Sequence, residues 1–178
     1  MAYSHDQNFK NLILDYPQQA LELFAASESS GLGQGVRITP IRQEQLKSRL
    51  GDRFRELDVP LLVEWPDGRY EALLFILEEE TNPSRFSIHR LAHYCLDLSE
   101  MYATSRVVPV VIFLRASDQI PKMLILGGDH HSYLNFNYLN CELADLDASQ
   151  YLDSQNLVAR LNLPNMRWKA GQKVDVGR

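Results

Sequence analysis

Three acidic residues, Asp58, Glu78 and Glu80, have the side chains and the spacing to do metal chemistry. Asp58 opens an apolar run that continues to Trp65, and Glu78 and Glu80 follow a second apolar run that begins at Tyr70. Carboxylates gathered at one end of a hydrophobic hairpin repel one another unless they bind an ion, exchange a proton or pair with a positive charge. Oxygen-rich clusters suit a hard divalent cation such as Mg²⁺ or Mn²⁺, which can activate a water molecule and stabilise charge on a scissile phosphate.

The alternation of side chains along a strand decides which of these carboxylates can meet. Residues two apart share a face, so Glu78 and Glu80 lie together and Glu79 takes the other side. Asp58 must reach the same face to complete a metal site. The alternative interpretation is that residues 78–80 form a solvated strand end and that Asp58 lies in a loop.

The register of the hairpin therefore controls the site. A four-residue turn leaves Asp58 on the wrong face. A three-residue turn that pairs Trp65 with Arg69 puts Asp58 opposite Ile76, on the required face. A bulge near Pro60 has the same effect, because a proline inside a strand often marks such an irregularity. The site requires one of these two features.

The elements that must position these residues are typical of a mixed α/β domain. Apolar residues at helical spacing predict helices, and Val-, Ile- and aromatic-rich runs between turn signals predict strands. Asp67-Gly68 predicts the turn of the hairpin, and Ser84 is the expected N-cap of the long helix that follows. The first predicted helix follows Ser4 and is interrupted at Pro17; the other predicted helices are 18–26, 43–50, 85–103 and 151–163, and the predicted strands are 36–41, 59–65, 70–80, 107–114, 122–126 and 133–141.

Composition sets the broad class. The 178 residues fit one domain, and 45 % of them are hydrophobic, which is ordinary for a globular protein. No apolar stretch approaches the roughly 20 residues that span a bilayer, and the N-terminus lacks a signal-peptide pattern, so we expect a cytoplasmic protein without a membrane partner.

Cys95 and Cys141 form no CxxC pair and are expected to be free thiols. The net charge of -5 argues mildly against an obligate nucleic-acid binder, although a local basic patch can coexist with it.

The motifs around the carboxylates resemble a known nuclease group. Nineteen residues separate Asp58 from the Glu78-x-Glu80 pair, and this arrangement on a hairpin before a long helix looks like the PD-(D/E)XK nuclease superfamily. The segments 57–62 and 77–81 are similar to the recombination-promoting nuclease / transposase family, as are two shorter motifs. These are Asp6-x-x-Phe9-Lys10 near the start and Arg90-Leu91-x-x-Tyr94 after the hairpin; the resemblance covers about residues 6 to 165.

The resemblance implies a restriction-endonuclease-like mixed sheet flanked by helices in residues 1–165, with a helical C-terminal extension and a polar tail at 166–178. It implies a Mg²⁺- or Mn²⁺-dependent DNA endonuclease, with Asp58 and Glu78 as metal ligands and Glu80 as the third catalytic residue. The same motifs imply supporting or phosphate-binding roles for Lys10, Arg90 and Tyr94. Glu22 resembles a glutamate that some superfamily members add to the site from an upstream helix.

The sequence departs from the family at Glu80, where Lys or Gln usually stands. A glutamate can accept a proton or bind a second metal, but it brings no positive charge to the phosphate. The alternative is therefore a nuclease-like fold that has lost catalysis and acts as a binding or assembly module. A third possibility is a scaffold whose acidic hairpin end only solubilises a strand edge. A homodimer is expected by analogy, because cutting both strands of DNA with one small site often needs two copies.

Other candidate residues have simpler interpretations. Five arginines bracket the acidic cluster and can either meet phosphates or neutralise nearby glutamates. Asp129-His130-His131 is predicted to be a polar loop, because adjacent histidines on a regular strand cannot both point to one ion. The arginines are Arg53, Arg55, Arg69, Arg85 and Arg90.

Overall fold

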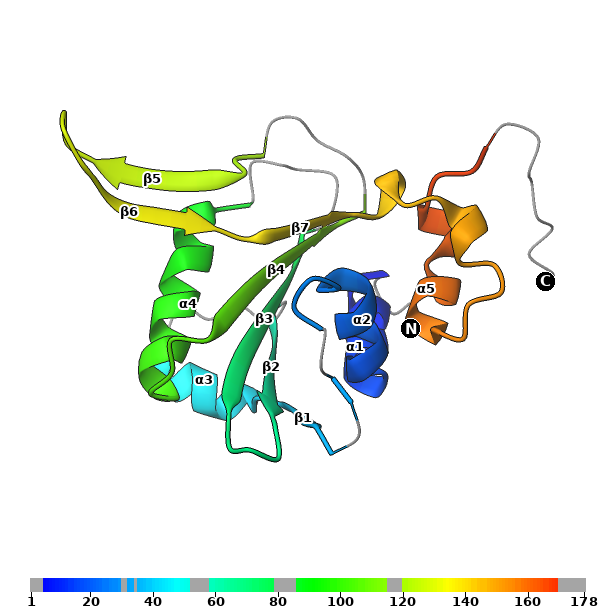
Figure 1. Cartoon of the computed structure of the whole chain (residues 1–178), viewed down its shortest axis with the longest axis horizontal. Helices are drawn as coiled ribbons and strands as arrows, with labels where there is room; N and C mark the ends of the chain where they lie inside the picture. Colours follow the sequence, from blue (N-terminus) through cyan, green and yellow to red (C-terminus); the bar gives the residue numbers. More distant parts are fainter. Residues whose placement is uncertain are drawn as a thin grey trace.

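Branched and aromatic residues build a five-stranded sheet with helices against both faces and a two-stranded arm at one side (Figure 1). The computed structural model describes residues 5–29, 32–33, 35–51, 58–78, 86–114 and 120–169, and for residues 5–7, 43, 50, 58 and 70–78 it describes the backbone alone. The chain has a mixed α/β fold, as the sequence predicts. Among the described residues, no helix is both long enough and apolar enough to cross a bilayer.

Two short helices at the N-terminus cover one face of the sheet. They are α1 (His5–Asp15) and α2 (Pro17–Phe24). Pro17 occupies the first position of α2, where the missing N–H costs no helical hydrogen bond. The break at Tyr16 lets both helices turn their apolar sides toward the sheet. Ala20, Leu21 and Phe24 of α2 are buried there.

The main sheet has the strand order β1-β2-β3-β4-β7. Strands β1, β2 and β3 are antiparallel neighbours, whereas β4 runs parallel to β3 and β7 runs parallel to β4. Helix α4 connects the parallel pair β3 and β4, and helix α3 lies between β1 and β2. The bounds are β1 Arg37–Pro40, α3 Gln43–Leu50, β2 Asp58–Glu64, β3 Tyr70–Glu78, α4 Ile88–Met101, β4 Val107–Phe113 and β7 Leu139–Glu142.

The sheet separates two hydrophobic clusters. One cluster contains α1, α2 and the C-terminal helix together with Val59, Leu61 and Val63 of β2. The other contains α3 and α4 together with Val111 and Phe113 of β4. The alternation of residues in β2 and β4 between these clusters defines two faces, here named the α2 face and the α4 face.

Helix α4 begins later than the sequence predicts. Its N-cap is Ser87, whose Oγ accepts a hydrogen bond from the Arg90 backbone N–H at 3.3 Å. The predicted cap, Ser84, lies outside the described residues, and the predicted start at residue 85 is wrong. Ile88 is the first residue of the helix to enter the core, so the cap directly before it fixes the start.

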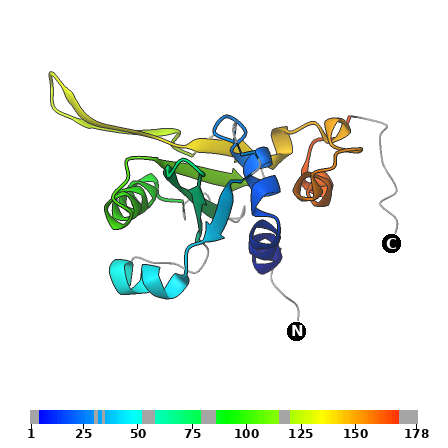
Figure 2. The ribbon, with the colours of Figure 1, turned by 60° about the horizontal axis from the view of Figure 1, so that its bottom comes forward.

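The strand predicted over residues 133–141 is divided at Tyr138. Its first half is β6 (Ser132–Asn137), which pairs with β5 (Met123–Gly127) to form the arm. Its second half is β7, which pairs with β4 in the main sheet. Figure 2 shows the arm extending well beyond the body of the molecule.

The C-terminal region is less helical than predicted. Only Leu157–Leu161 forms an α-helix, α5, and the prediction of a helix over 151–163 is wrong for the rest. The Asn156 side chain caps α5 by accepting from the Ala159 N–H at 2.9 Å and ties it to α2 by donating to the Gln19 carbonyl at 2.8 Å. Three 3-10 turns surround α5; they are η3 Leu143–Asp145, η4 Ala148–Gln150 and η5 Leu163–Asn165.

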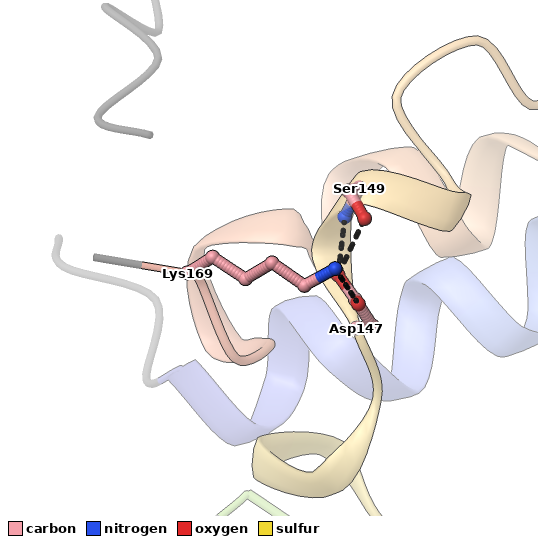
Figure 3. A network of polar contacts seen from close by, with 3 residues as sticks. All are labelled: Asp147, Ser149 and Lys169. Atoms are coloured by element: carbon pink, nitrogen blue, oxygen red, sulfur yellow. Dashed lines mark hydrogen bonds and ion pairs between the residues drawn. The ribbon is translucent and has the colours of Figure 1, made fainter. Parts of the chain in front are cut away.

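The predicted polar tail from residue 166 is wrong at its beginning. Met166 is buried in the core, and the Trp168 indole donates a hydrogen bond to the Leu163 carbonyl at 3.0 Å. Asp147 accepts hydrogen bonds from the Ser149 N–H at 3.0 Å and from the Ser149 hydroxyl at 2.6 Å (Figure 3). The Lys169 ammonium lies 3.5 Å from the other oxygen of Asp147, which anchors the last described residue to the fold (Figure 3).

Candidate functional site

A three-residue turn joins β2 to β3 and sets their register. The Trp65 N–H donates to the Arg69 carbonyl at 3.2 Å, and the Gly68 N–H donates to the Trp65 carbonyl at 3.0 Å. Gly68 has a φ of +81°, which a glycine adopts without strain. Asp67 supports the turn by accepting from the Arg69 N–H at 3.2 Å. Of the two irregularities that the sequence allows, the three-residue turn is therefore confirmed.

This register places Asp58 directly opposite Ile76. Asp58 is the first residue of β2 and Glu78 is the last residue of β3, so both stand at the same end of the sheet. Residues opposite one another or two apart share a face, so Asp58, Ile76 and Glu78 occupy positions on one face. Because Val59 belongs to the α2 face, these three positions belong to the α4 face.

A further carboxylate occupies the same row of the sheet. Glu78 lies opposite Phe113 of β4, and Phe113 lies opposite Glu142 of β7. Neighbouring strands are about 4.8 Å apart, so the backbones of Glu78 and Glu142 are separated by roughly 10 Å. The Phe113 ring stands between them, buried and packed edge-on against Phe86 at 5.8 Å. Sequence reasoning missed Glu142, because one glutamate at a strand end gives no local signal.

Glu142 affects the electrostatics of its surroundings. Its Oε1 accepts a hydrogen bond from the Asn140 amide at 2.8 Å. Burial, with a smaller contribution from the Glu142 charge, raises the pKa of Tyr138 to about 12 and that of Cys141 to about 12. The Tyr138 hydroxyl keeps its proton and donates it to the Pro121 carbonyl at 2.8 Å. Glu142 and Tyr138 are thus each held by a separate hydrogen bond near this end of the sheet.

Helix α4 starts at the end of the sheet where β3 finishes (Figure 1). Arg90 lies in its first turn and is half-buried. Tyr94, one turn later, is only 2 % exposed and packs in the cluster that contains Leu91 and Val111. A side chain so buried cannot contact a DNA phosphate, so Tyr94 has a packing role in the core.

Lys10 and Glu22 belong to the opposite side of the sheet. Both are on the helices that pack on the α2 face, where Lys10 is half-buried and Glu22 is exposed. Glu22 accepts a hydrogen bond from the Gln18 amide at 3.0 Å and lines a cavity of about 520 Å³ together with Asp15 and Gln155. The structure therefore does not bring either residue onto the face of Asp58 and Glu78.

The remaining predicted residues are placed as follows. Arg69 lies at the far end of the hairpin, where its Nε is 2.6 Å from the Asp67 carboxylate and its guanidinium is 5.1 Å from the Trp65 ring centroid. It therefore neutralises Asp67 and not the acidic cluster. Asp129, His130 and His131 are exposed in the turn of the arm, as expected for a polar loop. Glu80 lies outside the described residues, as do Glu79, Arg53, Arg55 and Arg85.

Two carboxylate positions at one end of a sheet are a suitable start for a cation site. Among the side chains that the structure describes, no three His, Cys, Asp or Glu residues form a metal-binding group. The side chains of Asp58 and Glu78 are outside that description, so the backbone register is the observation on which this site rests. The chain matches no known family model, no curated protein and no solved structure.

Proposed function

We propose that the chain is a divalent-metal-dependent DNA endonuclease whose site lies at the end of β2 and β3. The observation that carries this proposal is the register that puts Asp58 opposite Ile76 and two positions from Glu78 on one face. Two carboxylates at this spacing suit one Mg²⁺ or Mn²⁺ ion, which binds oxygen ligands at roughly 2.0–2.1 Å in the case of Mg²⁺. The alternative register would have separated the two residues onto opposite faces.

The order of elements supports a restriction-endonuclease-like fold. Helices α1 and α2 precede three antiparallel strands, α3 lies between the first two of these strands in the sequence, and α4 then crosses to a fourth strand parallel to the third. This is consistent with the order of motifs on which the resemblance to the PD-(D/E)XK superfamily rests, with Asp58 opening the hairpin and Glu78 closing it. The fold alone does not specify an activity, so the argument for hydrolysis rests on the carboxylates.

Each residue of the proposed site has a distinct task. Asp58 and Glu78 hold the ion, which when bound supplies an activated water and offsets negative charge on the phosphate. Glu80, two residues further along the sequence, accepts the proton of the attacking water. Arg90, in the first turn of α4, binds a neighbouring phosphate of the DNA backbone.

The competing proposal is a binding or assembly module built on the same fold. Glu80 favours this module, because it stands where the nuclease family usually has Lys or Gln and brings no positive charge to a phosphate. A module of this kind binds DNA or protein without hydrolysis. Measurements of cleavage and of metal binding distinguish the two functions.

The test is cleavage of plasmid DNA by the full chain in Mg²⁺ and in Mn²⁺. Asp58→Asn and Glu78→Gln should each reduce the rate by at least about 100-fold, because each removes a carboxylate that holds the ion that activates the water. Glu64→Gln is the matched control, because Glu64 lies on the same strand and face but at the other end of the hairpin. Undiminished cleavage by a pure Glu78→Gln protein would refute the proposal.

A further inference from the structure

Two histidines, His89 and His93, share one side of helix α4. They are four residues apart, which is about one turn of an α-helix, so their side chains are neighbours with Cβ atoms roughly 5–6 Å apart. Both side chains are exposed, on the side of α4 that faces away from the sheet (Figures 1 and 2). The proposed nuclease function uses neither of them.

The rest of helix α4 fixes the spacing of this pair. The Ser87 hydroxyl caps the helix by accepting from the Arg90 N–H at 3.3 Å, directly before the two histidines. The opposite side of α4 is anchored in the core by six buried residues, which are Ile88, Leu91, Ala92, Tyr94, Cys95 and Leu98. A helix held in this way does not have to be ordered when a ligand binds, so two imidazoles on it are placed in advance.

Both imidazoles are available to a ligand. Neither His89 nor His93 makes a hydrogen bond or an ion pair with the other described residues. The remaining charges on α4 are one positive, on Arg90, and two negative, on Asp97 and Glu100. With neutral histidines the helix therefore carries no net positive charge that would repel a cation.

The imidazole nitrogen selects the class of ion. It suits Zn²⁺, Ni²⁺ and Cu²⁺, whereas Mg²⁺ prefers oxygen ligands. Zn²⁺ binds imidazole at roughly 2.0–2.1 Å, and a pair of histidines four residues apart on one helix face is a recurrent zinc-binding arrangement. Among the side chains that the structure describes, no third His, Cys, Asp or Glu joins this pair, so water completes the coordination of a bound ion.

We propose that His89 and His93 form a transition-metal site on the exposed side of α4, which binds one Zn²⁺ ion per chain through both imidazoles. The ion joins the first two turns of α4 and stabilises the folded state, because the unfolded chain does not hold the two histidines at this spacing. The site differs from the proposed site of Asp58 and Glu78 in its ligands and in its preferred metal. It does not depend on nuclease activity.

Calorimetric titration of the untagged full chain with Zn²⁺, repeated with Ni²⁺, tests the proposal. We expect a binding step that His89→Gln and His93→Gln each weaken at least about 10-fold, because the loss of either imidazole removes the chelate. His130→Gln is the matched control, because it removes an exposed histidine in the turn of the arm and should bind like wild type. A wild-type chain that binds neither ion overturns the proposal, as does a binding step that either α4 variant leaves unchanged.

A second variant separates the spacing of the pair from the number of histidines. His93→Gln combined with Leu96→His keeps two histidines on the exposed side of α4, since Leu96 is 60 % exposed. It places them seven residues apart, which is about 10 Å along the helix axis and too far for two imidazoles to share one ion at this bond length. This variant should bind Zn²⁺ at least about 10-fold more weakly than wild type. Equal binding would show that the one-turn spacing is not the site.

Thermal unfolding gives an independent readout. Zn²⁺ should raise the thermal midpoint of wild-type protein and of Glu78→Gln, but not that of His89→Gln. A Zn²⁺ effect that Glu78→Gln loses and His89→Gln keeps would assign the ion to the proposed nuclease site and overturn this proposal. Because Glu78→Gln should keep the Zn²⁺ site, failure of this proposal is distinguishable from failure of the proposed nuclease function.

Discussion

Asp58 lies directly opposite Ile76 across the β2–β3 hairpin. The length of the turn at the other end of the hairpin produces this pairing, since one more turn residue would move Asp58 to the face of Val59. The turn is three residues long and depends on Gly68 at a φ of +81°. The length of this turn therefore decides whether the carboxylates at the opposite end of the hairpin share a face.

Replacement of Gly68 should destabilise the protein through the backbone alone. Gly68→Ala places a Cβ in open space, so no clash contributes, but its φ of +81° is unfavourable for alanine. We expect a loss of about 1 kcal/mol in the free energy of unfolding, measured by urea titration. Gly33→Ala is the control, because Gly33 also has open space and does not have a positive φ. Equal stability of the two variants would contradict this explanation.

Binding of Mn²⁺ should separate an active site from a degenerate one. Calorimetric titration of wild-type protein should detect Mn²⁺ binding that Glu78→Gln weakens by at least about 10-fold, because one of the carboxylate ligands is lost. Glu64→Gln should bind like wild type. If wild-type protein binds no Mn²⁺ under conditions where it is folded, the binding-module alternative is favoured and the nuclease proposal fails at its first step.

Local signals in the sequence were sufficient for most of the sheet. The turn at Asp67-Gly68, the proline at the start of α2 and the apolar run of β4 each predict their element without help from the rest of the chain. The alternation of side chains left two arrangements that put Asp58 on the face of Glu78, a three-residue turn and a bulge near Pro60. Only the observed strand pairing shows that the turn is the one present. The choice depends on contacts between strands, which a single sequence does not contain.

The wrong and missing predictions also depend on tertiary contacts that a single sequence does not contain. The apolar pattern over 151–163 resembles a helix, yet Asn156 caps a new helix inside it and η4 ends before it. The resemblance assigns Tyr94 to the site, yet the packing of α4 on the sheet buries it in the core. Glu142 lies in the same row as Glu78 only because β7 pairs with β4, and this pairing joins strands that are far apart in the sequence.

Acid should weaken the C-terminal anchor at Asp147. Hydrogen bonds from the Ser149 hydroxyl and N–H, aided by the charge of Lys169, hold the pKa of Asp147 below its ordinary value of 3.8. A lowered pKa in the folded state adds stability that is present above about pH 4 and is lost as the pH falls through the folded value. Asp147→Asn should therefore lower the thermal midpoint at pH 7, and the difference from wild type should shrink below pH 4.

The control for this effect is Asp129→Asn, which changes an exposed aspartate in the turn of the arm. We expect its thermal midpoint to follow that of wild type at every pH. A difference between Asp147→Asn and wild type that stays constant from pH 7 to pH 3 would show that the carboxylate charge is not the cause.

The two thiols should be unreactive in the folded protein. Burial raises the pKa of Cys95 from 9.0 to about 12, and burial together with the Glu142 charge raises that of Cys141 from 9.0 to about 12. The thiolate is the reactive form, so alkylation by iodoacetamide at pH 8 should be slower on the order of 1,000-fold than in urea-unfolded protein. Glu142→Gln should speed labelling of Cys141 but not of Cys95, as followed by mass spectrometry of each peptide. Rapid labelling of both cysteines in folded wild-type protein would mean that the core around them opens frequently, contrary to the burial seen here.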